Sequence, residues 1–430
     1  MKANRVKNLA LITPTTLLVG VDGHQENNTA GFSLANGNEP VRPVKFGNNR
    51  RGFLELLEKT NRVMSRNGLD SVVFVLEPNG PYWQLLARFL SARDYVVKVV
   101  NPLQVKMNRQ TGDPSPDKND FRDARSAADL GRQGKFNQTA LLDQRYEDLR
   151  MLAGLRDSLV EERSMHKHRL RCGLVRTFPE LRRCTSDLFG KGMRALLQVA
   201  PSAEAVVWLG TEAVSEVLKS ATRGRLGKKK AIQIVNAAKE SVGYAEATCA
   251  VRLQVESILS VAELLSEKIE QIELEMERLV SDLDEAALIL SIPGIGLVTA
   301  AAILGQIGGF SQYENPGQIR KLAGLDVVGS QSGNHQGKLA ISKRGRKLLR
   351  KVLYQAAVSS LACNEVSIRF YNGLIESTRP NRLKKKQALV AVMGKLIEIM
   401  FALVRTGKPF EFEHEWTRPG QAPEDLAQAA

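Results

Sequence analysis

One stretch decides the fold of this chain: Asp117-Lys118-Asn119-Asp120-Phe121-Arg122-Asp123-Ala124-Arg125. Residues 124–130, which follow, favour a helix, and helical side chains three residues apart project from one face. Asp120 and Asp123 are therefore expected side by side. Their mutual repulsion is relieved when a cation lies between them, and Mg²⁺ prefers such oxygen ligands. Taken alone, the pair is more typical of a solvated helix face, so its meaning depends on the residues upstream.

Two apolar segments upstream predict buried strands that end in an acid. The first ends at Asp22 and the second, residues 71–77, ends at Glu77. Two further strands of a meander are expected at 29–34 and 41–46, helices at 52–64 and 82–90, and a last strand at 95–100. The order of three strands, helix, strand, helix, strand and acidic helix is that of an α/β RNase H-like (RuvC-like) fold.

In that fold the first and fourth strands are neighbours, so Asp22 faces Glu77. The helix that carries Asp120 and Asp123 then packs across the ends of both strands. Four carboxylates at one sheet edge form a site for two metal ions, which activate an attacking oxygen and stabilise a leaving one at phosphorus. The alternative is a set of accidental surface acids. His24, close to Asp22, is left without an assigned role.

The length, composition and net charge of the chain indicate a folded protein with a polyanionic partner. The chain has 430 residues, enough for two or three domains, with 43% hydrophobic and 25% charged residues. Its 61 Lys and Arg against 46 Asp and Glu give a net charge of +15, which favours nucleic acid as the partner over a merely basic protein. Residues 338–408 hold sixteen basic and three acidic residues, a difference of +13.

The expected compartment is the bacterial cytoplasm, with the protein on the nucleoid when it acts and no membrane partner. The four cysteines are far apart without a CxxC pair, which suits a reducing compartment and argues against a zinc site. The N-terminus lacks the apolar core of a signal peptide. The longest uncharged run, residues 286–313, is broken by Pro293 and Gly294 and predicts buried helices of a soluble protein.

The middle of the chain is predicted to be helical. A heptad seam occupies residues 258–283, with Ile258, Ala262, Leu265, Ile269, Ile272, Met276, Leu279 and Leu283 at steps of four and three. Because residues 253–285 hold ten acids and two basic residues, this helix is a poor surface for DNA. We expect a coiled coil that dimerises or braces domains; a long helix packed against its own domain is the alternative. Residues 175–250 have no assignment.

The last third combines a glycine-rich turn with basic residues. Residues 291–300 (SIPGIGLVTA) are typical of a helix-hairpin-helix module, whose glycines let backbone N–H groups approach a phosphate. A tight turn between helices explains the same glycines. The basic residues expected to hold nucleic-acid backbone are Lys343, Arg344, Arg346, Lys347, Arg382, Lys384, Lys385 and Lys386. Beyond residue 408 the chain is predicted to be a flexible acidic tail.

These motifs together resemble the DEDD transposases of the insertion-sequence family numbered one hundred and ten, which also contains the Piv DNA invertase. The first half matches through Val19-Gly20-Val21-Asp22, the Glu77 strand, Asn101-Pro102 and residues 118–125. The second half matches, in the same order, through residues 292–296, 322–325, Gln331-Ser332-Gly333 and 342–345. The resemblance spans residues 15–405 and is weakest over 175–250.

The resemblance implies a domain division and a set of roles. The division is a RuvC-like domain (1–145), a helical region with the coiled coil (146–285), a mainly α-helical transposase domain (286–408) and the tail (409–430). Asp22, Glu77, Asp120 and Asp123 would hold Mg²⁺, in two sites, with Mn²⁺ as a substitute. Ser332 would attack the scissile phosphodiester and leave a covalent phosphoserine link to DNA. By spacing alone, Ser330 and Ser342 compete for that role, and His335 is a candidate helper.

The family further implies a structured bridge RNA that pairs with donor and target DNA. Base pairing would then read the sequence, while the protein reads RNA shape and backbone. Joining four strand ends requires several active sites, which implies a homodimer or homotetramer.

Two alternatives to a serine recombinase remain open from the sequence. The same four acids suit a RuvC-like metal-dependent DNA nuclease or junction resolvase, in which water attacks and no covalent intermediate forms. A non-catalytic nucleic-acid-binding protein on a degenerate RNase H-like scaffold is the other, against which four intact acids argue.

Overall fold

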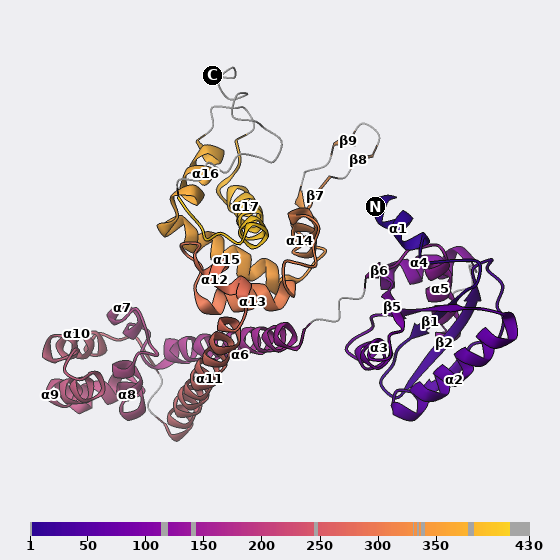
Figure 1. Ribbon diagram of the computed structural model, residues 1–430. Coiled ribbons are helices and arrows are strands. Elements are labelled where there is room, and N and C mark those ends of the chain that lie inside the picture. Colours follow the sequence, from indigo (N-terminus) through magenta and orange to yellow (C-terminus); the bar gives the residue numbers. More distant parts are fainter. Residues whose placement is uncertain are drawn as a thin grey trace, which may run out of the picture. The chain divides into compact units, whose positions relative to one another are not determined.

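A computed structural model of the chain describes residues 2–112, 119–138, 143–244, 248–329, 331–332, 335–336, 340–376 and 382–412 (Figure 1). Several predictions fall outside these residues: those on Asp117, Lys118, Ser330, Gly333 and the tail from residue 413 onward. The chain divides into two compact units, Met1–Leu141 (the N-terminal unit) and Leu142–Ala430 (the C-terminal unit). The finer division of the C-terminal unit into domains stays a prediction.

The N-terminal unit is built on a six-stranded mixed sheet. Its strands are β1 (Thr16–Asp22), β2 (Asn27–Leu34), β3 (Val44–Gly47), β4 (Ser71–Glu77), β5 (Val96–Val99) and β6 (Asn137–Gln138), in the spatial order β3-β2-β1-β4-β5-β6. β1, β2 and β3 pair antiparallel, and β1, β4 and β5 pair parallel. The predicted neighbour relation of the first and fourth strands is therefore confirmed.

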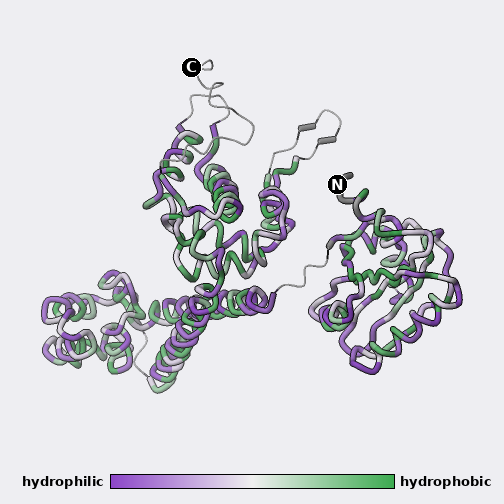
Figure 2. Tube along the Cα trace, in the orientation of Figure 1, coloured by the Kyte–Doolittle hydropathy of each residue, from purple (hydrophilic) through white to green (hydrophobic). Residues whose placement is uncertain are grey.

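In the described part of this unit, five helices accompany the sheet. They are α1 (Lys2–Leu9), α2 (Arg50–Asn67), α3 (Trp83–Ser91), α4 (Pro102–Gly112) and α5 (Asp120–Arg132). Because successive strand residues point to opposite faces, β1 buries two sets of side chains. Leu17, Val19 and Val21 pack with α2 and α3, whereas Leu18 packs with α4 and α5. Figure 1 shows these two helix pairs on opposite sides of the sheet, and Figure 2 shows the hydrophobic residues following the central strands.

The C-terminal unit is mostly helical. Its helices are α6 (Gln144–Thr177), α7 (Leu181–Cys184), α8 (Lys191–Val199), α9 (Ala203–Thr222), α10 (Lys228–Lys239), α11 (Cys249–Ser281), α12 (Asp284–Leu290), α13 (Leu297–Ile307), α14 (Pro316–Leu322), α15 (Lys347–Cys363), α16 (Glu365–Ile375) and α17 (Lys385–Thr406). Four two-residue strands form two small hairpin ladders: β7 (Val327–Val328) with β10 (Ala340–Ile341), and β8 (Gln331–Ser332) with β9 (His335–Gln336).

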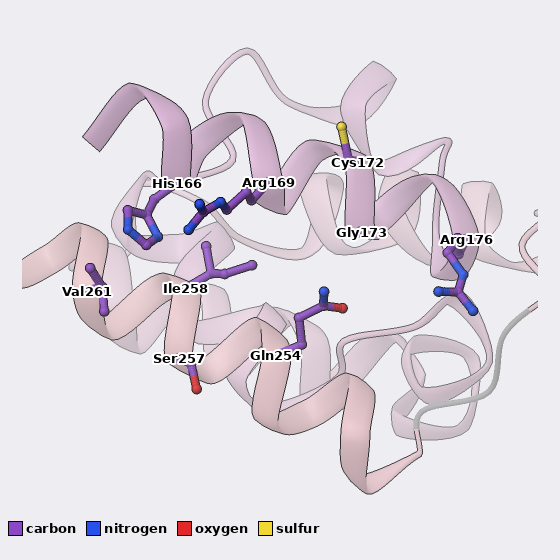
Figure 3. A pocket seen from close by; sticks show the side chains of 9 residues that line it. All are labelled: His166, Arg169, Cys172, Gly173, Arg176, Gln254, Ser257, Ile258 and Val261. Atoms are coloured by element: carbon purple, nitrogen blue, oxygen red, sulfur yellow. The ribbon is translucent and has the colours of Figure 1, made fainter. Parts of the chain in front are cut away.

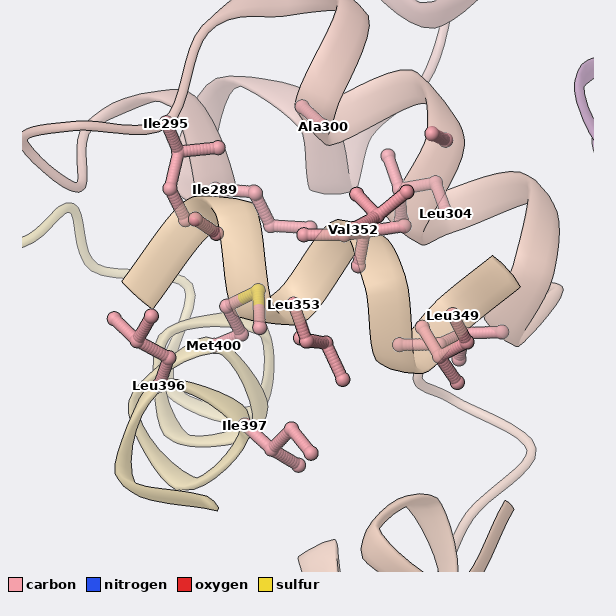
Figure 4. Packing of buried hydrophobic residues seen from close by; sticks show 14 of the residues in the cluster. Ile289, Ile295, Ala300, Leu304, Leu349, Val352, Leu353, Leu396, Ile397 and Met400 are labelled. Atoms are coloured by element: carbon pink, nitrogen blue, oxygen red, sulfur yellow. The ribbon is translucent and has the colours of Figure 1, made fainter. Parts of the chain in front are cut away.

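Two hydrophobic cores hold this unit together. One is centred on α13, which packs against α6, α11, α12 and α15, while α17 packs on α12 and α15. Residues such as Leu304, Leu353 and Ile397 are fully buried there (Figure 4). The other lies within residues 170–259, where α7 to α10 pack against α6 and α11. The region that the sequence left unassigned is thus a helical bundle with a core of its own.

The heptad seam of α11 is occupied within the chain. Ile258, Ala262, Leu265, Ile269, Met276 and Leu283 are 0% to 8% exposed. α11 runs against α6 and also touches α13. This is the arrangement of a long helix packed against its own domain, so the structure does not confirm a dimerising coiled coil.

The apolar C-terminal segments are core elements. The uncharged run at 286–313 forms α12 and α13, and α13 is buried over most of its length, as predicted. α17 is long and apolar enough to cross a membrane by length and composition alone, but half of its most apolar stretch is buried against its neighbours. α17 is therefore read as a core helix.

The predicted flexible tail includes a residue that packs on the core. Phe410 is 9% exposed in the core around α13, and its backbone N–H donates to Ser291 Oγ at 2.8 Å. Its ring also meets Phe412 edge to face. The burial of Phe410 does not fit a flexible tail at that residue, and the rest of the predicted tail stays a prediction.

Candidate active site

Strand alternation places Asp22 and Glu77 on one face of the sheet. The two residues are register partners on the parallel pair β1 and β4, at the carboxyl ends of both strands. Gly20 of β1 and Val75 of β4 contact α5, and Asp22 and Glu77 follow them by two residues. Because side chains two residues apart on a strand point to the same face, Asp22 and Glu77 point to the face that α5 covers. Asp22 is 1% exposed and Glu77 is 7% exposed. The predicted facing of these two acids is confirmed.

Two glycines allow α5 to lie directly on the sheet beside these acids. Gly20 and Gly31 are register partners on β1 and β2. A Cβ atom on Gly20 would lie 2.2 Å from the backbone oxygen of Ala124 and 2.2 Å from the nitrogen of Ala128. A Cβ atom on Gly31 would lie 2.9 Å from the carbonyl carbon of Ala124. Only glycine permits so close an approach of helix and strand backbones.

The N-terminus of α5 is fixed at the same edge. The side chain of Asn119 accepts a hydrogen bond from Phe121 N–H at 3.0 Å and caps the helix. Asp120 and Asp123 occupy the first turn, as the sequence predicts. The three elements β1, β4 and α5 carry the four acids that we call the acid cluster: Asp22, Glu77, Asp120 and Asp123. Among the described residues, Asp22 and Asp120 lie close enough to share an ion, whereas Glu77 and Asp123 are not part of that close group.

His24 joins two members of the acid cluster. Its Nε2 atom is 3.2 Å from Asp22 Oδ2 and 3.6 Å from Asp120 Oδ1. The backbone of His24 is held by Asn28 Oδ1, which accepts from its N–H, and by Asn48, which donates to its carbonyl. Ligand atoms of Asp22, His24 and Asp120 all lie within 4.8 Å of one another. The only sequence signal for His24 was its place two residues beyond Asp22.

Asp123 has a different partner. Arg109 of α4 donates from Nη1 to Asp123 Oδ1 at 2.5 Å, and both side chains are largely buried. In this arrangement the guanidinium supplies the positive charge that Asp123 needs at 5% exposure. The sequence did not indicate Arg109, because its role follows from the packing of α4 on α5.

The electrostatics of Asp22 favour a bound cation. Burial raises the pKa of the Asp22 carboxyl, and the nearby charges of Asp123 and Asp120 raise it further. His24 and a hydrogen bond from Asn79 to Oδ1, at 3.2 Å, act in the opposite direction. Ionised Asp22 is therefore costly without a positive partner. The carboxylate oxygens of Asp22 and Asp120 are donors that suit Mg²⁺ or Mn²⁺.

The predicted serine segment is described only in part. Ser332 lies on β8 and is the register partner of His335 on β9. Ser330 lies outside the described residues, as do the side chains of Ser332 and His335. Ser342 follows β10, and its N–H donates to the carbonyl of Asp326 at 2.7 Å.

Most of the predicted basic residues are exposed. Exposed side chains belong to Lys343, Arg344, Lys347, Arg382, Lys384, Lys385 and Lys386. Arg346 is different: its guanidinium donates to the carbonyl of Gln306 at the C-terminal end of α13. Arg150 donates to the carbonyl of Gly305 at 3.0 Å. Both arginines thus satisfy the last carbonyls of α13, and this internal role does not fit the predicted phosphate contact of Arg346.

The glycine-rich turn fits the simpler of its two interpretations. Gly294 has a φ of +93°, and a Cβ atom there would lie 2.8 Å from the Cα and N atoms of Ser360 on α15. The glycine is therefore needed for the turn between α12 and α13 to pack on α15. Gly296, by contrast, is exposed with open space around it.

Comparison with known proteins identifies the family. A family model for the DEDD transposases of IS110 type matches residues 19–179, and a second, for transposases of the IS116/IS110/IS902 family, matches residues 286–372. The chain belongs to the IS110 family of transposases. The first match contains the whole acid cluster and the second contains Ser332.

Relatives of the IS110 family agree with this assignment. An insertion element IS116 protein of Streptomyces clavuligerus is 26% identical over 405 residues, which cover 91% of this chain and 95% of the relative. The pilin gene-inverting protein of Moraxella bovis is 31% identical over 156 residues, 34% of this chain and 46% of the relative. The transposase for insertion sequence IS1328 of Yersinia enterocolitica is 36% identical over 93 residues, 22% and 28% respectively.

The family assignment gives the fold and the general activity. The DEDD domain of IS110 transposases implies an RNase H-like fold, with which the sheet order β3-β2-β1-β4-β5 agrees. The chain is an enzyme, a transposase, and its substrate is DNA.

Proposed function

We propose that this transposase cuts and rejoins DNA through a covalent phosphoserine intermediate, with Mg²⁺ held by the acid cluster. The observation that carries the metal half of the proposal is the meeting of Asp22, His24 and Asp120, with Asp22 buried among like charges. Ser332 carries the other half, through its Gln-Ser-Gly motif within the second family match.

The residues of the acid cluster have separable tasks. Asp22 and Asp120 provide carboxylate oxygens, and Glu77 provides a third from the neighbouring strand. Bound Mg²⁺ would lower the pKa of the attacking hydroxyl and neutralise charge that develops on the phosphoryl oxygens. His24, beside both Asp22 and Asp120, completes the donor set or takes the proton of the attacking hydroxyl. Arg109 holds the Asp123 carboxylate in place through their ion pair.

The covalent step balances without ATP. Ser332 Oγ forms a bond to phosphorus while the bond from phosphorus to one deoxyribose oxygen breaks. The proton leaves Ser332 for a base and is returned to the departing deoxyribose oxygen. One phosphodiester is replaced by another, so a second deoxyribose hydroxyl can reverse the step on a new strand end.

The partners follow from the same proposal. Donor and target DNA are the substrates, a structured guide (bridge) RNA selects them, and a homodimer or homotetramer supplies enough sites for four strand ends. The exposed basic residues Lys343, Arg344 and Lys347 support a backbone contact next to the serine segment in sequence. A DNA nuclease or junction resolvase that uses the acid cluster alone remains the second candidate, because the cluster is complete without Ser332.

Covalent trapping separates the two. The enzyme is incubated with Mg²⁺, its guide RNA and DNA that carries the element end, then denatured, and protein–DNA adducts are mapped by mass spectrometry. We expect an adduct on Ser332 in the wild type, none in Ser332→Ala or Asp22→Asn, and an undiminished adduct in the control Ser342→Ala. If Ser332→Ala still cuts DNA at the wild-type rate, the nuclease alternative is correct.

A further inference from the structure

A groove in the C-terminal unit has no role in the chemistry described above. It lies between α6 and α11 and has a volume of about 560 Å³. His166, Arg169, Cys172 and Arg176 line it from α6, and Gln254 and Ser257 line it from α11. Figure 3 shows Gln254 reaching toward the α6 side, with Arg169 and Arg176 on the opposite wall.

The groove is cationic. None of the described residues that line it is acidic. Arg169 and Arg176 are exposed, and neither has an acidic partner within the described part of the chain. Glu263 of α11, one turn away, is already paired with Arg194 at 2.5 Å. These two guanidinium groups are therefore available to an anionic ligand.

The surroundings of the groove are also basic. Residues 163–239 hold sixteen Lys and Arg and five Asp and Glu, a difference of +11. Most of this charge is exposed, for example at Arg171, Arg182 and Arg183. An excess of positive charge spread over such a surface favours a polyanion over a single small anion.

An exposed aromatic ring stands at one end of the groove. Tyr244 is 76% exposed, and its ring centroid is 5.9 Å from the guanidinium carbon of Arg176. Its backbone N–H donates to the carbonyl of Arg176 at 3.0 Å, which fixes the ring beside the groove. A base that is not paired can stack on such a ring while its phosphates meet the arginines.

We propose that the groove between α6 and α11 binds a single-stranded segment of nucleic acid, with Arg169 and Arg176 on the phosphates and Tyr244 under a base. Arginine supplies the planar, always charged donor that phosphate recognition requires, and the ring gives sequence-tolerant stacking. RNA and DNA share this chemistry, and the experiment distinguishes them. The proposal does not depend on the roles of Ser332 or the acid cluster.

The test measures binding of the full-length protein to polyuridine RNA, polythymidine DNA and duplex DNA over a range of salt concentrations. Arg169→Gln with Arg176→Gln should weaken binding of the single strand about tenfold and reduce the salt slope by about 1.4, the value for two lost phosphate contacts. Tyr244→Ala should weaken it at least about fivefold with an unchanged slope. The charge-matched control is Arg51→Gln with Arg62→Gln, two exposed arginines already paired with glutamates on α2.

A second substitution tests the groove without removing an arginine. Gln254→Glu places a carboxylate in the groove without changing side-chain size and should weaken binding to a similar degree. Gln271→Glu, exposed on the same helix outside the groove, should not. Melting temperatures of all variants establish that they are folded.

Footprinting gives a readout without substitution. Arg169 and Arg176 line the groove and are exposed, so bound nucleic acid should protect both from phenylglyoxal while the exposed Arg51 stays reactive. If one single strand, RNA or DNA, protects the groove in the wild type and binds the groove variants more weakly, the proposal is supported and that nucleic acid is the ligand. Variants that bind single strands like the wild type, a loss confined to duplex DNA, or reactive Arg169 and Arg176 in the presence of the single strand would overturn it.

Discussion

Replacing Gly20 with alanine tests how the fold positions the acid cluster. The new Cβ atom would lie 2.2 Å from two backbone atoms of α5, so the helix must retreat from the strand by about 1 Å to restore van der Waals contact. The neighbours are backbone atoms and cannot rotate away. The helix carries Asp120, whose carboxylate now lies 3.6 Å from His24 Nε2. The retreat therefore changes the distance from Asp120 to Asp22 and His24.

Two quantities should respond to Gly20→Ala. Overpacking of this kind lowers the free energy of unfolding by roughly 1–3 kcal/mol. A displacement near 1 Å in a catalytic constellation lowers turnover by about a hundredfold. Thermal unfolding and the rate of cleavage of element-end DNA measure the two effects. Gly154→Ala on α6, where a Cβ atom meets nothing within 4 Å, is the control and should leave cleavage unchanged. A folded Gly20→Ala enzyme with wild-type cleavage would refute the proposed positioning.

Three further substitutions have defined outcomes. Burial raises the pKa of Asp22, so its ionised form costs folding free energy above its usual pKa. Asp22→Asn should therefore raise the metal-free melting temperature at pH 7 while abolishing cleavage, and a lower melting temperature would contradict this cost. Arg109→Gln leaves Asp123 buried without its ion pair and should lower the unfolding free energy by about 3 kcal/mol in the presence of a chelator. Adding Mg²⁺ should recover part of this loss. Equal losses with and without Mg²⁺ would show that Asp123 does not share the metal site. Phe410→Ala removes a buried aromatic side chain and should lower the free energy of unfolding, measured by chemical denaturation, by about 3 kcal/mol. An unchanged denaturation midpoint would show that Phe410 does not pack on the core.

The fold of the N-terminal unit could be predicted because its strands carry strong local signals. β1 and β4 are continuous apolar runs that end in an acid, and strand alternation then determines which face Asp22 and Glu77 share. Asp120 and Asp123 follow in the same way from helical spacing behind the cap at Asn119. These features depend on residues that are close in sequence.

The parts that the sequence did not reveal depend on tertiary packing. The Arg109–Asp123 pair exists because α4 lies on α5, and no local pattern marks it. The role of Gly20 depends on Gly31 of the neighbouring strand and on the helix above both. The heptad seam of α11 was visible, but sequence periodicity does not say whether its partner is another copy or, as found, α6 of the same chain. The charge of residues 163–239 is dispersed over several helices and only becomes a surface when they fold.

The central claim, that the acid cluster binds the divalent ions used for DNA cleavage, is tested most directly by Mn²⁺ binding followed by electron paramagnetic resonance. The full-length wild type should bind Mn²⁺ in competition with Mg²⁺, and Asp22→Asn with Asp120→Asn should remove that binding while the protein stays folded. Mn²⁺ binding that survives the double substitution would place the metal elsewhere and contradict the account.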